Sequence, residues 1–168
     1  KVIYKNLQNL NYTFDYKVIK ASEFGLPQHR PRIYMVGFHK PKLKNMYKEL
    51  AFNFPREIPL KKTMSDIFGG FVSKEINSRE ERKVGFTLRV GGGRSPINDR
   101  RNWDGYIVKN KVVRIKPSQG LEMMGFPKNF KMPVSDNQAM KQLGNSVAVN
   151  VVKEIGKEIQ SHLKLYAK

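Results

Sequence analysis

The clearest pattern in the sequence is amphipathic and lies near the C-terminus. Hydrophobic positions recur there every four residues and predict a long helix with one buried stripe, formed by Val147, Val151, Ile155, Ile159 and Leu163. A shorter pattern of helical spacing over residues 1–12 predicts a first helix. Because the chain begins with Lys1 inside this pattern, we expect it to be a piece of something longer.

Two apolar runs between these ends predict β-strands. Residues 16–19 read YKVI and residues 32–38 read RIYMVGF, with a turn predicted between them at Gly25-Leu26-Pro27. The second run is the more apolar, so we expect that strand to be covered on both faces.

In the middle of the chain, hydrophobic positions show no sustained helical or strand periodicity. Between residues 61 and 113, short strand-like runs at 85–90 and 103–108 lie among glycine clusters and polar stretches. This pattern is typical of a small, loop-rich insertion. After residue 117 a helical pattern returns and ends at Gly125-Phe126-Pro127.

Basic residues far outnumber acidic ones. The chain has 32 Lys and Arg against 14 Asp and Glu, a formal net charge of +18. Such an excess repels itself in a compact fold unless a polyanion is a regular partner, and nucleic acid is the first candidate. The alternative from charge alone is a cationic protein from a lysine-rich proteome.

The arginines favour nucleic acid over general background charge. Seven of the ten fall between Arg79 and Arg114, whereas lysine is spread more widely. The planar fork of arginine suits bidentate readout of guanine, while lysine acts more as a point charge on phosphate. The cluster therefore indicates a recognition surface.

Several classes of site are excluded or disfavoured by composition. The chain has no cysteine, which excludes disulfides and cysteine-based metal sites, and its three histidines show no metal-ligand spacing. No apolar run approaches the length of a membrane span, and the start does not resemble a signal peptide.

The first candidate constellation is Gln28-His29-Arg30-Pro31-Arg32, which leads into the second predicted strand. Pro31 biases Arg30 toward an extended backbone, and residues two apart in extended chain point the same way. Arg30 and Arg32 would then present two guanidinium forks on one side, suited to a phosphate or to the carbonyl of an extruded base. The alternative is a pair of solvated arginines at a strand start.

The second constellation is the segment 141–147, at the expected start of the last helix. Gly144 allows a close backbone approach, and Ser146 is a natural N-cap whose neighbouring free N–H groups could accept a carboxylate or phosphate. The alternative is an ordinary capped helix start.

The third constellation is a glycine triplet between two arginines. Such a loop lets the backbone approach a large ligand while the arginines contact it; the alternative is a mobile surface loop. Its members are Arg89, Gly91, Gly92, Gly93 and Arg94.

Three stretches, in this order and spacing, resemble the closing motifs of the DNA cytosine-5 methyltransferases. Residues 25–38 (GLPQHRPRIYMVGF) resemble the eighth motif, residues 114–127 (RIKPSQGLEMMGFP) the ninth, and residues 138–155 (QAMKQLGNSVAVNVVKEI) the tenth. The ninth departs from the family's usual residues at Ser118, Gln119 and Glu122. The resemblance covers nearly the whole chain, and an unrelated basic RNA- or ribosome-binding protein would require three coincidences.

The resemblance implies roles for individual residues. Arg32 would hold the flipped cytosine, with Arg30 supporting the site and Gln28 buttressing the loop. Residues that would border S-adenosylmethionine are Asn145, Ser146 and Val147. Residues that would contact double-stranded DNA are Arg89, Gly91, Gly92, Gly93, Arg94, Arg100 and Arg101, within the family's variable target-recognition region.

The same resemblance implies an incomplete enzyme. In the family a cysteine thiolate attacks the flipped base at C6, and this chain has no cysteine, so alone it should not methylate DNA. It would be one subunit of a split enzyme, the second part of a single enzyme, or a relic that remains a non-catalytic DNA-binding module. The first two readings require an N-terminal half that carries the cysteine. The resemblance also implies a bacterial cytoplasmic protein that associates with the nucleoid through DNA.

The fold implied is α/β: the C-terminal part of a Rossmann-like methyltransferase sheet plus a small, irregular, mostly β target-recognition domain. Residues 1–40 would end the catalytic domain, residues 41–115 would form the recognition region, and residues 116–168 would return to the catalytic domain. Much apolar surface on the strands and the last helix should then face the missing half.

Overall fold

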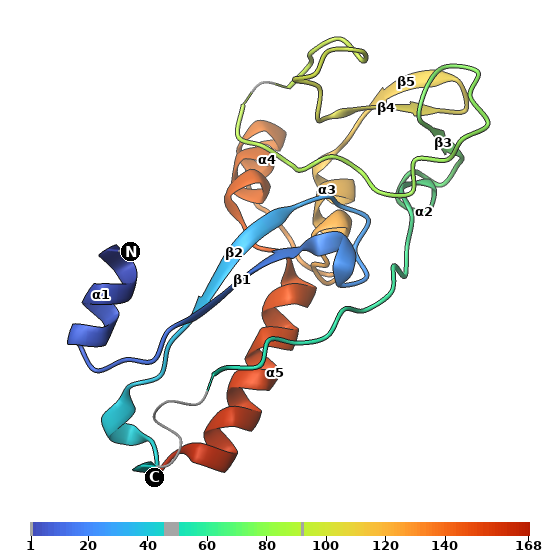
Figure 1. Cartoon of the computed structure of the whole chain (residues 1–168). Coiled ribbons are helices and arrows are strands. Elements are labelled where there is room, and N and C mark those ends of the chain that lie inside the picture. The colour runs from blue at the N-terminus through green and yellow to red at the C-terminus, as the bar shows by residue number, and fades with distance from the viewer. Residues whose placement is uncertain (1, 46–50, 92) are drawn as a thin grey trace. The chain divides into compact units, whose positions relative to one another are not determined.

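The computed structural model describes residues 2–45, 51–91 and 93–168. Its helices and strands follow one another along the chain as α1 (Val2–Asn9), β1 (Asp15–Lys20), β2 (Pro31–Val36), α2 (Met64–Phe68), β3 (Val72–Ser73), β4 (Gly105–Val108), β5 (Lys111–Arg114), α3 (Pro117–Met123), α4 (Asp136–Asn145) and α5 (Val149–Tyr166) (Figure 1). Two short 3-10 turns, η1 (Ala21–Glu23) and η2 (Lys40–Lys42), flank β2.

The chain divides into two compact units. The first consists of Lys1–Ile19, Pro31–Arg56 and Val152–Lys168, and the second of Lys20–Arg30 and Glu57–Val151. β1 and β2 pair into a two-stranded sheet, and α5 supplies its C-terminal part to the first unit. The helices and strands expected at both ends of the sequence are therefore present.

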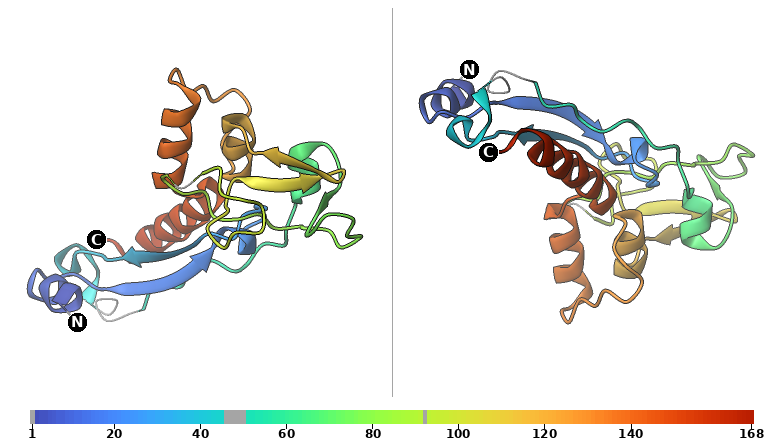
Figure 2. Two further views of the ribbon diagram at one scale, coloured as in Figure 1. Left: turned by 90° about the horizontal axis from the view of Figure 1, so that it is seen from above. Right: turned by 90° about the horizontal axis from the view of Figure 1, so that it is seen from below.

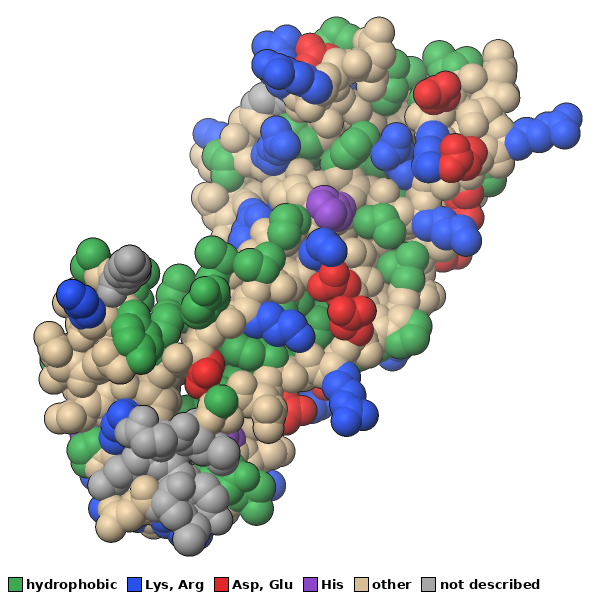
Figure 3. All heavy atoms as spheres, viewed as in Figure 1, with side chains coloured by type: hydrophobic (Ala, Val, Ile, Leu, Met, Phe, Trp, Pro, Cys, Tyr) green, Lys and Arg blue, Asp and Glu red, His purple; other side chains and the backbone are tan. Residues whose placement is uncertain are grey.

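The strand β2 is less covered than its composition suggests. Ile33 is 57% exposed and Met35 is 50% exposed, so the expectation of cover on both faces is wrong. On β1, Tyr16 and Val18 are likewise exposed. Side chains two apart share a face of a strand, so each strand presents an apolar face to its surroundings. Figure 3 shows hydrophobic side chains gathered along these strands. An apolar strand is buried only if another element covers it.

Aromatic rings pack around His162 of α5 in the first unit. The imidazole stacks on Phe38 with ring centroids 4.2 Å apart, and Tyr166 meets it edge-on at 4.6 Å. Phe52 also lies edge-on to the ring. His162 is buried, and burial lowers its pKa below the usual 6.5, a shift that the carboxylate of Asp15 opposes.

We expect this histidine to make stability depend on pH. Because the folded state disfavours the protonated ring, stability is complete above the unfolded pKa of about 6.5 and is lost as pH falls below it, by at most about 1.4 kcal/mol per pH unit. Urea unfolding between neutral and mildly acidic pH measures this slope. The variant His162→Phe keeps an aromatic ring and should flatten it; an unchanged slope would contradict the assignment.

The second unit is built on an antiparallel sheet of order β3-β4-β5. Gly105 faces Arg114 and Val108 faces Lys111 across the β4–β5 pair. The helices α3 and α4 lie side by side next to this sheet (Figure 2). The buried core of the unit combines both layers and consists of Met64, Ile67, Val72, Leu88, Trp103, Tyr106, Ile115, Met123, Met124 and Leu143.

The run at residues 85–90 does not form a strand, although its sequence predicts one. The Gly85 amide donates to the carbonyl of Pro27 and its carbonyl accepts from the amide of His29. Gln28 and Gly85 thus form an isolated bridge, and no longer ladder follows it. The run at 103–108 is a strand only from Gly105 onward. For the run at 85–90 the backbone therefore bonds to a segment distant in sequence.

Within the described ranges, no helix has both the length and the apolar character needed to cross a membrane.

Candidate functional site

A buried arginine joins three distant segments of the second unit. Arg30 is 2% exposed, and its Nη1 donates to the carbonyl of Leu88 at 3.1 Å. Its Nη2 donates to the carbonyls of Gly144 (2.9 Å) and Ser146 (2.6 Å). Hydrogen bonds donated by a charged guanidinium are stronger than those between neutral groups. The expectation that Arg30 and Arg32 present two forks to one ligand is therefore wrong, because the Arg30 fork lies inside the fold.

Gln28 lies in the same buried cluster. Its Nε2 donates to the sulfur of Met124 at 3.1 Å, and its Oε1 accepts from the amide of Leu88 at 3.4 Å. The side chain is fully buried, where an amide without partners would be costly. Gln28 and Arg30 thus fix the backbone on either side of His29, and the Leu88 backbone is bound by both.

Arg32 is the exposed arginine of the predicted constellation. It lies at the start of β2, and its Nη1 donates to the carbonyl of Pro31 at 2.8 Å. This local bond leaves most of the fork's donors directed to the surroundings. Arg32 can therefore contact a ligand that Arg30 cannot reach.

The connection between α4 and α5 differs from the predicted helix start. Ser146 is the C-cap of α4, and its hydroxyl donates to the carbonyl of Leu143. The expectation that Ser146 caps the last helix is wrong, because α4 continues to Asn145 and α5 begins only at Val149. Asn145 and Val147 are exposed and Ser146 is half-buried, so all three remain accessible.

Gly144 allows the close backbone approach expected from the sequence. A Cβ at this position would lie 2.7 Å from the carbonyl carbon of Arg89 and 2.9 Å from the amide nitrogen of Val90. Real Cβ atoms essentially never come that close to backbone, so only glycine fits. The segment 144–146 therefore contacts the start of the arginine- and glycine-rich loop directly.

The described parts of that loop, residues 89–91 and 93–94, make hydrogen bonds with residues of the segment that directly precedes β4. The Trp103 indole donates to the carbonyl of Gly91 at 3.0 Å, and the Arg94 amide donates to both carboxylate oxygens of Asp104 at 3.0 and 3.1 Å. Arg89 and Arg94 carry exposed side chains on these parts of the loop. The predicted contact Gly92 lies outside the described residues.

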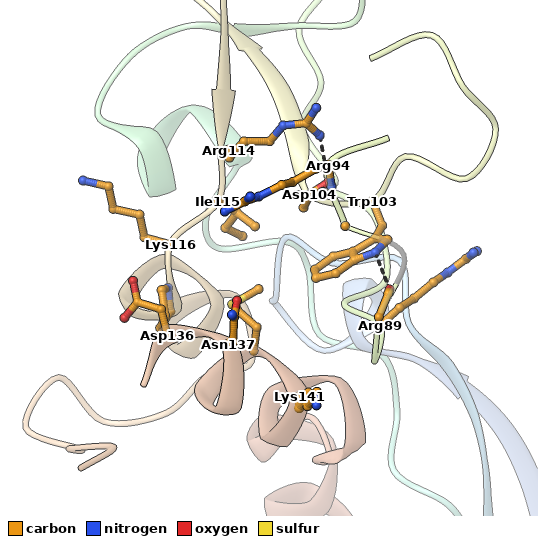
Figure 4. A pocket seen from close by; sticks show the side chains of 14 residues that line it. Arg89, Arg94, Trp103, Asp104, Arg114, Ile115, Lys116, Asp136, Asn137 and Lys141 are labelled. Atoms are coloured by element: carbon orange, nitrogen blue, oxygen red, sulfur yellow. Dashed lines mark hydrogen bonds and ion pairs between the residues drawn. The ribbon is translucent and has the colours of Figure 1, made fainter. Parts of the chain in front are cut away.

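A basic hollow of about 540 Å³ opens beside the loop (Figure 4). Its cationic lining consists of Arg89, Arg94, Arg114, Lys116 and Lys141. Two carboxylates also line it, and one of them, Asp104, is already paired with Arg114 at 2.8 Å. Such a surplus of cations over anions attracts a polyanion and concentrates it at the hollow.

The neighbouring arginines at 100 and 101 are exposed but differ in their pairing. Arg101 makes a bidentate pair with Asp99, with Nη2 2.7 Å from Oδ2, and this pair lowers the pKa of Asp99 to about 2. Arg100 is exposed beside it. A polyanion would compete with Asp99 for the Arg101 fork.

Sequence reasoning did not assign Trp103, Asp104 or Lys116 to a ligand-binding surface, whereas Lys141 belongs to the predicted constellation 141–147. Trp103 is the only tryptophan of the chain and directly precedes a buried acid, which is the one local signal of a structural role. Lys116 carries no local signal, because lysine is spread along the whole chain. Among residues 2–45, 51–91 and 93–168, no group of acidic or histidine side chains could hold a metal ion.

A family model and curated relatives match most of the chain. A sequence model of the family "C-5 cytosine-specific DNA methylase" matches residues 1–91 and 70–161. The chain is 36% identical to the Type II methyltransferase M.SsoII of Shigella sonnei, over 96% of this chain and 48% of that protein. It is 33% identical to M.DsaV of Dactylococcopsis salina, over 95% of this chain and 51% of that protein.

The fold has solved counterparts as well. The Entamoeba histolytica methyltransferase EhMeth superposes with a TM-score of 0.64 at 14% identity, covering 96% of this chain and 57% of that one. The chain spans about half the length of the curated relatives that it matches. Its helices and small sheets are those of an α/β methyltransferase fold. The chain belongs to the family of C-5 cytosine-specific DNA methylases.

Proposed function

We propose that this chain forms the C-terminal part of a DNA cytosine-5 methyltransferase. It binds double-stranded DNA sequence-specifically and helps transfer a methyl group from S-adenosylmethionine to C5 of a flipped cytosine. The observation that carries this proposal is the buried fork of Arg30, which bonds to Leu88 and to Gly144 and Ser146. One side chain thereby joins the three segments whose sequences resemble the base-holding, DNA-reading and cofactor-bordering parts of the family.

Arg32 holds the flipped cytosine in this proposal. Its fork is exposed and can donate to the carbonyl of an extruded base, which is reachable only after the base leaves the helix. Arg30 and Gln28 are positioning residues, because their side chains are buried and bonded within the fold. They set the backbone that leads to Arg32.

S-adenosylmethionine, when bound, supplies the activated methyl group. The residues that would border it are Asn145, Ser146 and Val147, which are exposed or half-buried at the α4–α5 connection. They fit such a ligand, since an amide, a hydroxyl and an isopropyl group lie together on one short segment. The carbonyl of Ser146 accepts from Arg30, so this segment is held to the cluster that positions the base.

The nucleophile comes from an N-terminal half, because this chain has no cysteine. The exposed apolar side chains of the first unit support such a partner, since hydrophobic surface of this kind is typical of interfaces. They are Val2, Ile3, Tyr4, Leu10, Tyr16, Val18, Ile33, Met35, Val152, Leu163 and Leu165. In the same proposal residues 1–40 and 116–168 belong to the catalytic domain and residues 41–115 to the recognition region.

Sequence specificity should depend on Arg89 and Arg94. If either fork reads a base, its replacement by alanine costs about 1–3 kcal/mol of discrimination. The preferred sequence is first selected from a randomised duplex pool by the wild-type chain. Each variant is then titrated at fixed salt with the preferred duplex and with single-mismatch duplexes.

The control for this measurement is Lys164→Ala on α5. It should weaken binding little and equally for all duplexes, since a peripheral lysine contributes at most to phosphate contact. Equal losses on matched and mismatched duplexes for Arg89→Ala and Arg94→Ala would make both arginines phosphate contacts and move base readout elsewhere.

A further inference from the structure

We propose that Trp103 and Asp104 determine DNA specificity without touching DNA. As positioning residues they hold Gly91 and Arg94, which lie on the two described sides of the loop from Arg89 to Arg94, before DNA binds. This inference rests on the proposed DNA-recognition function. It adds a mechanism, in which the backbone that carries the guanidinium groups of Arg89 and Arg94 is positioned before DNA is contacted.

Trp103 holds the loop at Gly91. It is 5% exposed, and its indole N–H donates to the carbonyl of Gly91 at 3.0 Å. A Cβ on Gly93 would lie 3.5 Å from the indole ring, so the ring also lies close to Gly93. With so little exposure the ring cannot stack on a base, and its effect on DNA must pass through the loop.

Asp104 holds the end of the loop. Both of its carboxylate oxygens accept from the Arg94 amide, and Oδ1 also accepts from Nη1 of Arg114 at 2.8 Å. The other arm of Arg114 donates to the carbonyl of Ser95 at 2.8 Å. Arg114, although part of the arginine cluster, is therefore tied to the loop's support. Figure 4 shows this pair beside the Trp103 ring.

The backbone of Arg94 shows that this support is needed. Its φ is +68°, in the left-handed region that residues other than glycine and asparagine rarely adopt. Such a conformation persists only where surrounding contacts fix it, and here the Arg94 amide is bound by Asp104. The chain thus keeps an arginine where glycine would be less strained, as expected if the fork has a function.

The beginning of the loop is fixed independently. The Leu88 carbonyl accepts from Arg30, and Gly144 packs against the backbone of Arg89 and Val90. Because residues 88–91 and Arg94 make these contacts, the side chains of Arg89 and Arg94 start from positioned Cα atoms. Preorganisation of this kind reduces the entropy lost on binding, and it orients directional donors before contact.

Loss of the support should therefore affect discrimination more than affinity. Phosphate contacts depend on net charge and tolerate a moving loop, whereas bidentate readout of a base requires a defined fork geometry. A role in folding alone predicts the opposite pattern, with equal loss on every duplex.

The test is selection from a randomised duplex pool by the full chain, with sequencing of the bound fraction. Trp103→Phe keeps an aromatic ring without the N–H donor and should lower enrichment of the preferred sequence about two- to tenfold, the range of one lost hydrogen bond. Asp104→Ala should lower it more. Asp104→Asn, which keeps an acceptor oxygen for Arg94, should restore part of the loss. Affinity for the unselected pool should stay within about twofold.

The matched control is Glu80→Gln. It changes net charge as Asp104→Asn does, but at an exposed carboxylate paired with Lys74. Its enrichment should equal that of the wild type. Emission of Trp103, the only tryptophan, shows in the Asp104 variants whether the indole stays buried and the unit stays folded.

The outcomes separate this inference from the proposed function. If the wild-type chain enriches no sequence, sequence-specific recognition by this chain is wrong and the inference fails with it. If the wild type enriches a sequence and folded Trp103→Phe and Asp104→Asn enrich it equally well, the proposed function stands and the positioning role is wrong. Equal loss of enrichment and of pool affinity in these variants would also contradict it.

Discussion

Replacement of Arg30 by methionine should lower the free energy of unfolding by about 3–5 kcal/mol, although no ligand is involved. Methionine fills much of the same volume but leaves the carbonyls of Leu88, Gly144 and Ser146 without their donor in a buried cluster. Each buried acceptor that loses its donor costs about 1–3 kcal/mol. Arg30→Lys should recover only part of the lost free energy of unfolding. Its ammonium keeps a charged donor but cannot span all three carbonyls.

Urea unfolding followed by Trp103 emission measures this effect, since that side chain belongs to the same unit as Arg30. The control Lys164→Ala replaces an exposed lysine and should change stability by less than about 0.5 kcal/mol. A loss below about 1 kcal/mol for Arg30→Met would show that the carbonyl contacts are dispensable, and the central observation behind the proposed function would lose its weight.

Replacement of Arg32 by alanine should leave the fold intact and lower the rate of methyl transfer about 100- to 1000-fold in the complete enzyme, the effect of removing one preorganised donor. Arg32 is exposed, so its loss opens no cavity. DNA affinity should change little, because it is spread over many phosphate contacts whereas the Arg32 contact forms only with the extruded base.

The matched control is Arg56→Ala, another exposed arginine in the same unit as Arg32. It removes the same charge and should keep the wild-type rate within about twofold. Single-turnover methyl transfer on DNA, together with the affinity of each variant, separates the two effects. A wild-type rate for Arg32→Ala would mean that another group holds the cytosine.

The elements that could be predicted from the sequence are those with a local period or a local stop. The helix α5 and the end of α3 before Gly125 depend on residues within a few positions of one another. Gly125 has a φ of +79°, which explains why the helix ends where glycine follows. The expected buried stripe on α5 is correct only in part: Val151 and Ile155 are buried, whereas Val147 lies before the helix and Leu163 is exposed. Order and spacing of three weak motifs then indicated the family, which the comparisons confirmed.

The candidate site could be predicted only in part, because its contacts join residues far apart in the sequence. Arg30 bonds to carbonyls 58, 114 and 116 positions away. Extended geometry alone placed its fork beside that of Arg32, and burial overrode that expectation. The strand predicted at 85–90 failed similarly, since Gly85 bonds to the turn at 27–29 and forms no ladder.

Composition could not distinguish arginines that are exposed to a ligand from arginines that pair within the fold. The arginine cluster indicated a recognition surface, and Arg89 and Arg94 are exposed as a recognition role requires. Arg114 belongs to the same cluster but pairs with the buried carboxylate of Asp104. Some arginines contact a ligand, and others support a neighbouring residue that contacts it. Which of the two roles an arginine has depends on its tertiary neighbours, which the sequence does not show locally.

We propose that this chain supplies the base-holding and DNA-reading half of a cytosine-5 methyltransferase and lacks the nucleophile. Transfer of labelled methyl groups from S-adenosylmethionine to duplex DNA is measured with the pure chain, with and without a cysteine-bearing N-terminal half. We predict no transfer by the chain alone and transfer when both halves are present, abolished by replacing that cysteine. Methyl transfer by the pure chain alone, or none from the combined halves, would show that the proposed division of the enzyme is wrong.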